Sequence, residues 1–227
     1  MTSTAAKPGA PAGHAEKMDR IYKLQRHFYD VTRKYFLLGR DVLIERMDIR
    51  PGMNVLEIGC GTARNLIALA RKHPQAHFFG LDASREMLEY AQKKIDAAKL
   101  TDRIVLKYCL AEELDAQRTF GLNAPFDAMF FSYSLSMIPT WRESLNAAFK
   151  NLAAGGTVYS VDFWDQKELP AAFRWLLVRW LALFHVEHRP ELLVFMRELE
   201  QLGVCSLELS PLYRRYAYIA SMKSTPK

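Results

Sequence analysis

The sequence predicts an α/β domain with a seven-stranded, mostly parallel β-sheet that ends in a C-terminal antiparallel hairpin. Between residues 54 and 163, short apolar runs that are typical of buried strands alternate with segments of helical periodicity. Such alternation indicates crossover connections and therefore parallel strands with helices on both faces. A glycine-containing turn follows the first strand, and a chain of 227 residues is long enough for one domain with a substantial core.

The N-terminal part of the chain is predicted to be a tail followed by a helical cap. Residues 1–16 are small, polar and proline-containing, and they lack the apolar core of a signal peptide, so we expect a flexible tail. Residues 17–38 place apolar and aromatic side chains on one helical face and mostly basic side chains opposite. A second helix over 39–47 precedes an Arg-Pro-Gly turn. These helices form a predicted cap, residues 17–48, on a single domain that spans 17–227.

The centre of the chain alternates between strand and helix. Runs of β-branched, leucine and aromatic residues predict the strands, and the segments between them have apolar residues at helical spacing. The first of these helices stops at Pro74, because proline cannot continue a helix. The predicted strands are 54–59, 77–82, 103–109, 126–134 and 156–163, and the predicted helices are 64–73, 84–100 and 140–152.

Local signals in the C-terminal half predict two further details. The helix over 140–152 is expected to begin with a capping box, Thr140 and Glu143, and to end at the Ala-Ala-Gly-Gly sequence that follows it. Residues 204–221 contain two β-rich runs around a Ser-Pro pair, and their short spacing predicts an antiparallel hairpin at the edge of the sheet.

An apolar insertion, residues 164–200, separates the last parallel strand from this hairpin. Its centre, AAFRWLLVRWLALFHV at 171–186, is shorter than the roughly 18 uninterrupted apolar residues that a membrane-spanning helix needs. Arg174 and Arg179 also interrupt it. We therefore expect no membrane span, but a segment that either contacts lipid or closes a pocket.

The composition suggests an anionic partner and a reducing compartment. The formal net charge is +6, which favours nucleic acid, an anionic membrane surface or an acidic metabolite as the partner. The three cysteines have no metal-ligand spacing, so we expect free thiols in a cytoplasmic protein. The histidines form no metal cluster in the sequence, and we expect no metal.

The segment VLEIGCGTARN, residues 55–65, carries the main chemical signal. A strand leads into Gly59-Cys60-Gly61 and then into a helix. Ligands of α/β proteins bind beyond the carboxyl ends of parallel strands, where glycines let a ligand approach the backbone. Asp82 ends the next strand, where an acid can accept two hydrogen bonds from a ribose diol. The pattern therefore indicates an adenosine-containing cofactor.

Two details favour S-adenosylmethionine over a dinucleotide. Arg64 occupies the position of the third glycine in the dinucleotide fingerprint, and no phosphate-binding lysine loop follows. A buried Glu57, two residues before the first glycine, repels a pyrophosphate but attracts a cofactor with an ammonium and a sulfonium. Simpler explanations remain open, because the glycines can form a plain tight turn, Glu57 can pair with a basic residue, and Asp82 can cap the following helix.

The segments VLEIGCGTARN and GLDASREML together resemble class I S-adenosylmethionine-dependent methyltransferases, over about residues 50–165. The resemblance implies a Rossmann-like fold in which Gly59 and Gly61 lie under the methionine moiety, Asp82 holds the ribose, and Ala83 and Met87 flank the adenine.

This chain departs from that pattern at the end of the third strand. The family's Gly-Asp-Ala reads Cys109-Leu110-Ala111 here, so the backbone of Ala111 or the side chain of Glu112 is expected to replace the aspartate. The resemblance implies the following cofactor-binding residues: Glu57, Gly59, Cys60, Gly61, Thr62, Asn65, Asp82, Ala83, Met87, Leu110, Ala111, Glu112 and Ser132.

Flanking segments resemble a narrower group. Residues 25–44, 133–141, 161–170 and 184–192 are similar to lipid N-methyltransferases, above all to the methyltransferase of bacterial betaine-lipid synthesis. The resemblance implies trimethylation of diacylglycerylhomoserine to diacylglyceryl-N,N,N-trimethylhomoserine, with a partner enzyme that makes diacylglycerylhomoserine. It also implies peripheral binding to the anionic inner face of the membrane, to which the basic side chains of the first helix would be attracted.

N-methylation requires a neutral amine aligned with the methyl donor at about 3 Å. Asp162, at the end of the fifth strand, can receive the amine's proton, and Tyr29 or Tyr133 can relay it. Loss of the proton to water is an alternative that needs no essential base. Aromatic faces suit a product with a fixed positive charge.

Other functions remain open on the sequence alone. Phosphatidylethanolamine N-methyltransferases are close relatives of the resembled group, and a soluble or quinone-like metabolite is a further candidate acceptor. An RNA-binding or RNA-modifying protein ranks third, because the basic residues lie on a helix with an apolar back rather than in a groove-like patch, so we expect no nucleic acid partner. A catalytically silent cofactor-binding protein is also conceivable.

Overall fold

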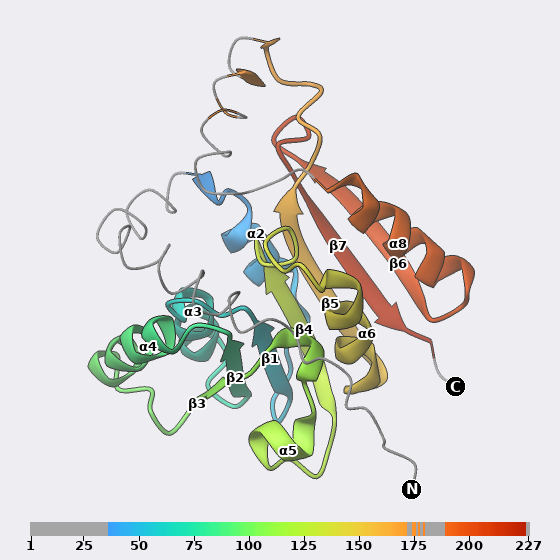
Figure 1. Cartoon of the computed structure of the whole chain (residues 1–227). Helices are drawn as coiled ribbons and strands as arrows, with labels where there is room; N and C mark the ends of the chain where they lie inside the picture. The colour runs from blue at the N-terminus through green and yellow to red at the C-terminus, as the bar shows by residue number, and fades with distance from the viewer. Residues whose placement is uncertain (1–35, 172–173, 176, 178, 180–188, 226–227) are drawn as a thin grey trace, which may run out of the picture.

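The computed structural model describes residues 36–171, 174, 175, 177, 179 and 189–225. It confirms the predicted seven-stranded sheet, with strand order β3-β2-β1-β4-β5-β7-β6 (Figure 1). The first five strands pair in parallel, and β7 pairs antiparallel with both β5 and β6. The strands are β1 (Asn54–Ile58), β2 (His77–Asp82), β3 (Ile104–Tyr108), β4 (Phe126–Ser132), β5 (Leu152–Phe163), β6 (Cys205–Leu212) and β7 (Ala217–Ser224).

Helices cover both faces of the sheet, as predicted. The described helices are α2 (Arg40–Arg46), α3 (Arg64–Lys72), α4 (Arg85–Ala97), the 3₁₀ turn η1 (Ala111–Glu113), α5 (Ala116–Phe120), α6 (Trp141–Lys150) and α8 (Pro190–Gln201). Buried side chains of α2, α3 and α4, such as Leu43 and Leu66, pack in one apolar core. Leu145 of α6 and Met196 of α8 pack in a second core. The sequence did not predict η1, α5 or α8.

The start and the end of α6 differ from the prediction. The side chain of Thr140 makes no capping hydrogen bond, so the capping box is not formed. The Ala-Ala-Gly-Gly sequence is not a helix cap, because α6 ends at Lys150 with Asn151 as its C-cap, and β5 begins at Leu152. The additional residues are taken up by a β-bulge opposite β4, where Gly155 has a φ of 73° that suits glycine.

The hairpin lies at the edge of the sheet as predicted, but its turn is displaced. Ser210 and Pro211 remain within β6, and the chain reverses over residues 213–216, where Tyr213, Arg214 and Arg215 have left-handed φ angles. Proline is compatible with β6 because β6 is the outer strand, in which alternate backbone N–H groups point away from the sheet.

Several predictions concern segments outside the described residues. These are the tail over 1–16, nearly all of the helix over 17–38 and much of the stretch 171–186. Within the part of the chain that the structure describes, no helix combines the length and the apolar character needed to cross a bilayer.

Candidate functional site

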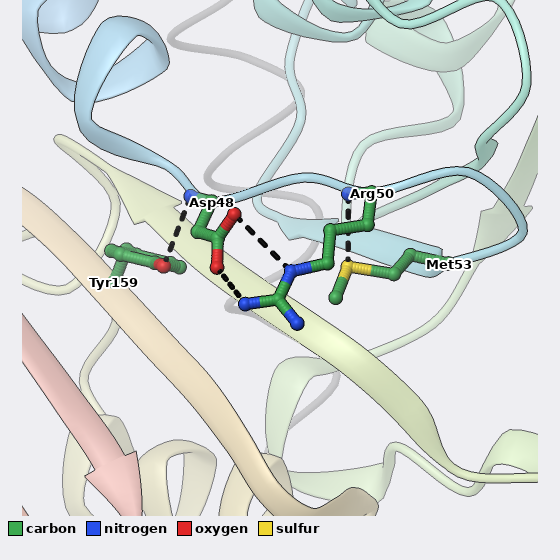
Figure 2. A network of polar contacts seen from close by, with 4 residues as sticks. All are labelled: Asp48, Arg50, Met53 and Tyr159. Atoms are coloured by element: carbon green, nitrogen blue, oxygen red, sulfur yellow. Dashed lines mark hydrogen bonds and ion pairs between the residues drawn. The ribbon is translucent and has the colours of Figure 1, made fainter.

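One cavity among the described residues does not lie where the sequence predicts the site. It measures about 430 Å³ and lies between the α2–β1 connection and the amino ends of β4 and β5. Figure 2 shows the polar contacts of residues that line this cavity. The Arg50 guanidinium pairs with the Asp48 carboxylate at 2.5 Å. The backbone N–H of Asp48 donates to the Tyr159 hydroxyl, and the backbone N–H of Arg50 donates to the Met53 sulfur. The Asp48–Arg50 pair is well exposed to solvent and therefore contributes little to stability. Ligands of parallel α/β sheets bind at the opposite, carboxyl end of the strands.

The second cavity, of about 230 Å³, lies at the carboxyl end of β1, where the sequence predicts the cofactor. It is formed by the β1–α3 loop, the first turn of α3, the start of α2 and the end of β4. We call it the carboxyl-edge pocket. The predicted residues that line it are Glu57, Gly59, Cys60, Gly61, Thr62, Asn65 and Ser132. It is also lined by Leu37, Arg40, Arg64 and Lys94, none of which appears in the set implied by the resemblance.

The β1–α3 loop is shaped by two glycines with positive φ, Gly59 at 75° and Gly61 at 51°. A Cβ on Gly59 would lie 2.7 Å from the Cβ of Ser134, so glycine is needed for space as well as for conformation. Ser134 is held there because its hydroxyl donates to the Ile58 carbonyl at 2.8 Å. The first residues after β4 therefore pack directly against the glycine loop.

Asp82 connects this loop to the end of β2. Its carboxylate accepts the backbone N–H of Gly61 at 2.8 Å and the backbone N–H of Ser84 at 2.9 Å. The cap of α4 is made by Ser84, whose hydroxyl accepts the Met87 N–H, so the helix does not depend on Asp82 for its side-chain cap. Each carboxylate oxygen has a second lone pair with which it can accept a ribose hydroxyl.

Glu57 is the most unusual side chain of the pocket. It is 2% exposed, and one of its oxygens accepts the Asn65 side-chain N–H at 2.7 Å. The other oxygen, Oε2, is buried and has no hydrogen-bond partner. Burial raises the pKa of Glu57 to about 8, although Asn65 and Arg40 act in the opposite direction. A buried, unpartnered acid is costly unless a ligand supplies the missing donor.

The predicted adenine-binding residues lie along the same edge of the sheet but outside the lining of the carboxyl-edge pocket. Ala83 and Met87 follow β2, and Leu110, Ala111 and Glu112 follow β3. Ala111 and Glu112 begin the turn η1, which the sequence did not predict, and the side chain of Glu112 is half-buried. Their contacts with adenine remain predictions.

The predicted catalytic residues have different surroundings. Tyr133 is buried, and its hydroxyl donates to the Leu38 carbonyl. Asp162 is fully buried and accepts the N–H groups of Ser136 and Phe163 at 2.9 and 2.8 Å, and burial raises its pKa to about 6. Neither lines the carboxyl-edge pocket, and Tyr29 lies outside the described residues. Their catalytic roles stay predictions.

Asp162 belongs to a clamp around the backbone of one residue of the β4–α6 loop, Ser136. It accepts the Ser136 N–H, while Arg189, just before α8, donates from Nε to the Ser136 carbonyl at 2.9 Å. The clamp holds the loop that also carries Ser134, and so it supports the glycine loop indirectly.

The chemistry of the pocket fits the amino-acid end of S-adenosylmethionine. Glu57 Oε2 lacks a donor that an ammonium would supply, and Arg40 and Arg64 line the same pocket. Cys60 does not compete as a nucleophile, because burial raises the pKa of its thiol well above the usual value. Among the described residues, no group of histidine, cysteine or acidic side chains is arranged to hold a metal ion.

Sequence reasoning did not place Leu37 or Arg40 at the cofactor. They precede the sheet by more than a dozen residues, and no local spacing connects them to the glycine loop. Only the tertiary fold, which brings the start of α2 over the end of β1, places them in the pocket.

Known proteins with similar sequences are methyltransferases. The chain is 27% identical over 186 residues to the demethylmenaquinone methyltransferase of Listeria welshimeri, which covers 79% of this chain and 72% of the relative. It is 30% identical over 153 residues to the enzyme of the same name from Halalkalibacterium halodurans, and this match covers 65% of this chain and 60% of the relative.

Solved structures confirm the fold. A candidate S-adenosyl-L-methionine-dependent methyltransferase from Methanococcus maripaludis superposes with a TM-score of 0.63 at 20% identity, covering 100% of this chain and 99% of the other. The [4+2]-cyclase SpnF also superposes, with a TM-score of 0.63 at 14% identity over 83% and 80% of the two chains. Because a cyclase shares the fold, the fold alone does not determine the reaction.

The family assignment rests on the sequence match. Residues 49–184, well over half of the chain, match the methyltransferase domain family. This range includes the glycine loop, Asp82 and the whole of the parallel sheet. The chain therefore belongs to the methyltransferase domain family, and its cofactor is S-adenosylmethionine.

Proposed function

We propose that this methyltransferase acts on a lipid amine at a membrane surface, and that it trimethylates diacylglycerylhomoserine. The observation that carries the proposal is the surface of the segment that follows β5 at the carboxyl edge of the sheet (Figure 1). Trp175 is 62% exposed there, and the Arg179 guanidinium lies 5.2 Å from the centre of its ring. Exposed tryptophan beside arginine is the combination that suits the boundary between acyl chains and anionic head groups.

The hairpin turn adds to this surface. Tyr213 is 50% exposed and Arg214 is exposed beside it. The turn is connected to the segment after β5, because the N–H of Gln166 donates to the Arg215 carbonyl and Arg215 pairs with Asp165. Peripheral attachment to the inner membrane face follows from this proposal, as does dependence on an enzyme that makes diacylglycerylhomoserine.

The reaction places modest demands on the protein. When bound, S-adenosylmethionine supplies an electrophilic methyl group. The chain must exclude water and present a neutral amine in line with that group. With a pKa of about 6, the Asp162 carboxyl is largely ionised at neutral pH and could take up a proton. Its present contacts support a positioning role for the β4–α6 loop more directly.

A second candidate is methylation of a quinone-like lipid. It is favoured by the similarity to the demethylmenaquinone methyltransferase of Listeria welshimeri. Both candidate acceptors are amphiphilic, so the exposed Trp175 surface is compatible with either. The two differ in the bond that is formed, nitrogen–carbon for the lipid amine and carbon–carbon for the quinone ring.

Methyl transfer to lipid vesicles tests the proposal. We expect labelled S-adenosylmethionine to label the lipid fraction of vesicles that contain diacylglycerylhomoserine, with the label in a quaternary ammonium product. Vesicles with phosphatidylethanolamine or with demethylmenaquinone serve as parallel acceptors. Label in the quinone alone would replace the lipid amine by the second candidate. No label in any lipid, but turnover of a water-soluble acceptor, would refute the membrane proposal altogether.

Replacing Trp175 by alanine should affect membrane-bound acceptors selectively. The variant loses a large exposed aromatic side chain, so we expect about five- to tenfold lower activity on vesicle-bound acceptor and unchanged activity on a short-chain, water-soluble analogue. Leu202→Ala is the control, because Leu202 is 76% exposed and caps the end of α8. The connection from α8 to β6 lies at the other end of the sheet from the segment that follows β5 (Figure 1). Equal loss on both acceptors would mean that Trp175 closes the pocket instead of contacting lipid.

A further inference from the structure

The β4–α6 loop connects the glycine loop to the end of β5 and the start of α8. At one end of the β4–α6 loop, Ser134 packs beside the glycine loop, where a Cβ on Gly59 would lie 2.7 Å from the Ser134 Cβ. The Ser134 carbonyl accepts the backbone N–H groups of Met137 and Ile138 at 3.1 and 3.0 Å. These two hydrogen bonds close a tight turn over 134–138, so the position of Ser136 within the turn constrains that of Ser134.

Both backbone polar groups of Ser136 are held by charged side chains. The Ser136 N–H donates to the Asp162 carboxylate at 2.9 Å, and the Ser136 carbonyl accepts from Nε of Arg189 at 2.9 Å. The other carboxylate oxygen of Asp162 accepts the Phe163 N–H at 2.8 Å. Asp162 is fully buried and Arg189 is half-buried. Hydrogen bonds to charged groups are stronger than those between neutral groups, and shelter from water preserves their strength.

Arg189 belongs to a part of the chain outside the matched methyltransferase domain, which ends at residue 184. The residue stands at the N-cap of α8, but its side chain does not cap that helix and extends to the β4–α6 loop instead. Leu192 and Met196 of α8 are buried in the same core as Leu135 of the loop. The base from which the Arg189 side chain extends is therefore fixed by packing.

The charge of Arg189 also acts on Asp162. Burial raises the pKa of the Asp162 carboxyl to about 6, while its hydrogen bonds and the charge of Arg189 oppose that rise. The other ionisable side chains that interact with this carboxylate in the described structure are Tyr133 and Tyr218. Burial raises the pKa of both tyrosines well above the ordinary value, so both are neutral. Arg189 therefore favours the ionised Asp162, the form that accepts two N–H groups.

We propose that Arg189 is a positioning residue of the methyl-donor site, which holds the Ser136 carbonyl, favours the ionised Asp162 and so keeps Ser134 against the glycine loop. In this role Arg189 touches neither cofactor nor acceptor, because it acts through the backbone of the β4–α6 loop. Since Ser134 fills the space beside Gly59, a loosened clamp lets the glycine loop depart from the geometry that binds S-adenosylmethionine. Affinity for the cofactor thus depends on the start of α8, outside the matched domain.

Calorimetric binding of S-adenosylhomocysteine tests this role. We expect Arg189→Gln to weaken binding by about three- to tenfold at about pH 7.5, because a neutral donor replaces a charged one and part of that loss reaches the glycine loop. Arg189→Lys keeps a charged donor and should restore the affinity to within about twofold of the parent protein. Arg197→Gln is the matched control, because Arg197 lies on α8 and pairs with Glu200 at an exposed position.

The charge of Arg189 should also appear in the pH dependence. Without it, the pKa of Asp162 rises further, so the carboxyl of Arg189→Gln is protonated at a higher pH than that of the parent protein. We expect the ratio of the two affinities to widen by roughly threefold as the pH falls from about 8 to about 6. The titration of Glu57 cancels in this ratio, because both proteins contain Glu57. Arg189→Lys should show no such widening.

The results separate a positioning role from a purely structural one. Weaker binding that lysine rescues, with a ratio that widens towards low pH, supports the proposal. A lower melting temperature with unchanged affinity would overturn it, since the clamp would then stabilise the fold without affecting the donor site. A loss of equal size at every pH would also overturn it, because the charge would then play no part. These measurements involve no acceptor, so their result is independent of whether the acceptor is a lipid amine.

Discussion

Replacing Asp82 by alanine is expected to weaken binding of S-adenosylhomocysteine by at least about 100-fold. Asp82 is predicted to accept two charged hydrogen bonds from the ribose hydroxyls, and the variant would lose both, at about 1.5–3 kcal/mol each. The variant also removes the acceptor of the Gly61 and Ser84 N–H groups, which loosens the glycine loop. Calorimetry measures the affinity, and circular dichroism with thermal unfolding verifies that the fold is kept.

Asp127→Ala provides a matched control for this experiment. Asp127 also accepts a backbone N–H, that of Asn54 at 2.8 Å, but it lies at the amino end of the sheet, away from the cofactor. Its loss should lower stability without changing the affinity for S-adenosylhomocysteine. If Asp82→Ala bound as tightly as the parent protein, the cofactor site would be elsewhere.

The second large effect is expected at Glu57 and should depend on pH. In the free protein the pKa of Glu57 is about 8, so the side chain is mostly protonated at neutral pH. An ammonium requires the ionised form, and binding therefore releases a proton below about pH 8. We expect the affinity for S-adenosylhomocysteine to rise by about tenfold from about pH 6 to about pH 7, since one proton is lost per ligand bound.

Glu57→Gln should remove this dependence. The amide cannot ionise, so we expect no proton release near neutral pH and an affinity at about pH 8 that is roughly 100-fold below that of the parent protein. Calorimetry in buffers of different ionisation enthalpy measures the released protons. Retained proton release in Glu57→Gln would assign the titration to another group and contradict the role of Glu57.

The same shift affects the stability of the free protein. The pKa of Glu57 is higher in the folded state than its ordinary value of 4.5, so the folded state holds a proton that the unfolded state gives up. Stability from this group is therefore fully present below about pH 4.5 and is lost as the pH rises towards about 8. Bound cofactor should oppose that loss, because its ammonium stabilises the ionised carboxylate.

The sequence predicted the parallel sheet well because its signals are local. Each of the five parallel strands has its own apolar run, and Pro74 or a polar turn marks where a helix stops. The glycine loop and Asp82 were also predicted from local signals, because the loop follows the first strand and Asp82 ends the second. The residues of the pocket that come from β1, α3 and β4 were accordingly identified, with the exception of Arg64.

What the sequence did not predict depends on contacts between distant parts of the chain. Pro211 suggested a turn, but an outer strand tolerates proline, and this is known only once β6 is placed at the edge. Ala-Ala-Gly-Gly suggested a helix end, but a bulge against β4 took the glycines into β5. Arg40 reaches the pocket only because hydroxyls from positions 133 and 216 hold the chain before it.

The clamp on Ser136 has a consequence for how acceptor preference can diverge. Asp162 lies at the end of β5, where the chain leaves the sheet, and Arg189 lies just before α8, yet both bind the backbone of Ser136. The stretch between Asp162 and Arg189 therefore starts and ends at residues that bind the same loop. Doubling the length of such a stretch costs only about 0.6 kcal/mol in loop-closure entropy. If this stretch contacts the acceptor, as the proposed function requires, then exchanging it would change the acceptor while the methyl-donor site keeps its geometry.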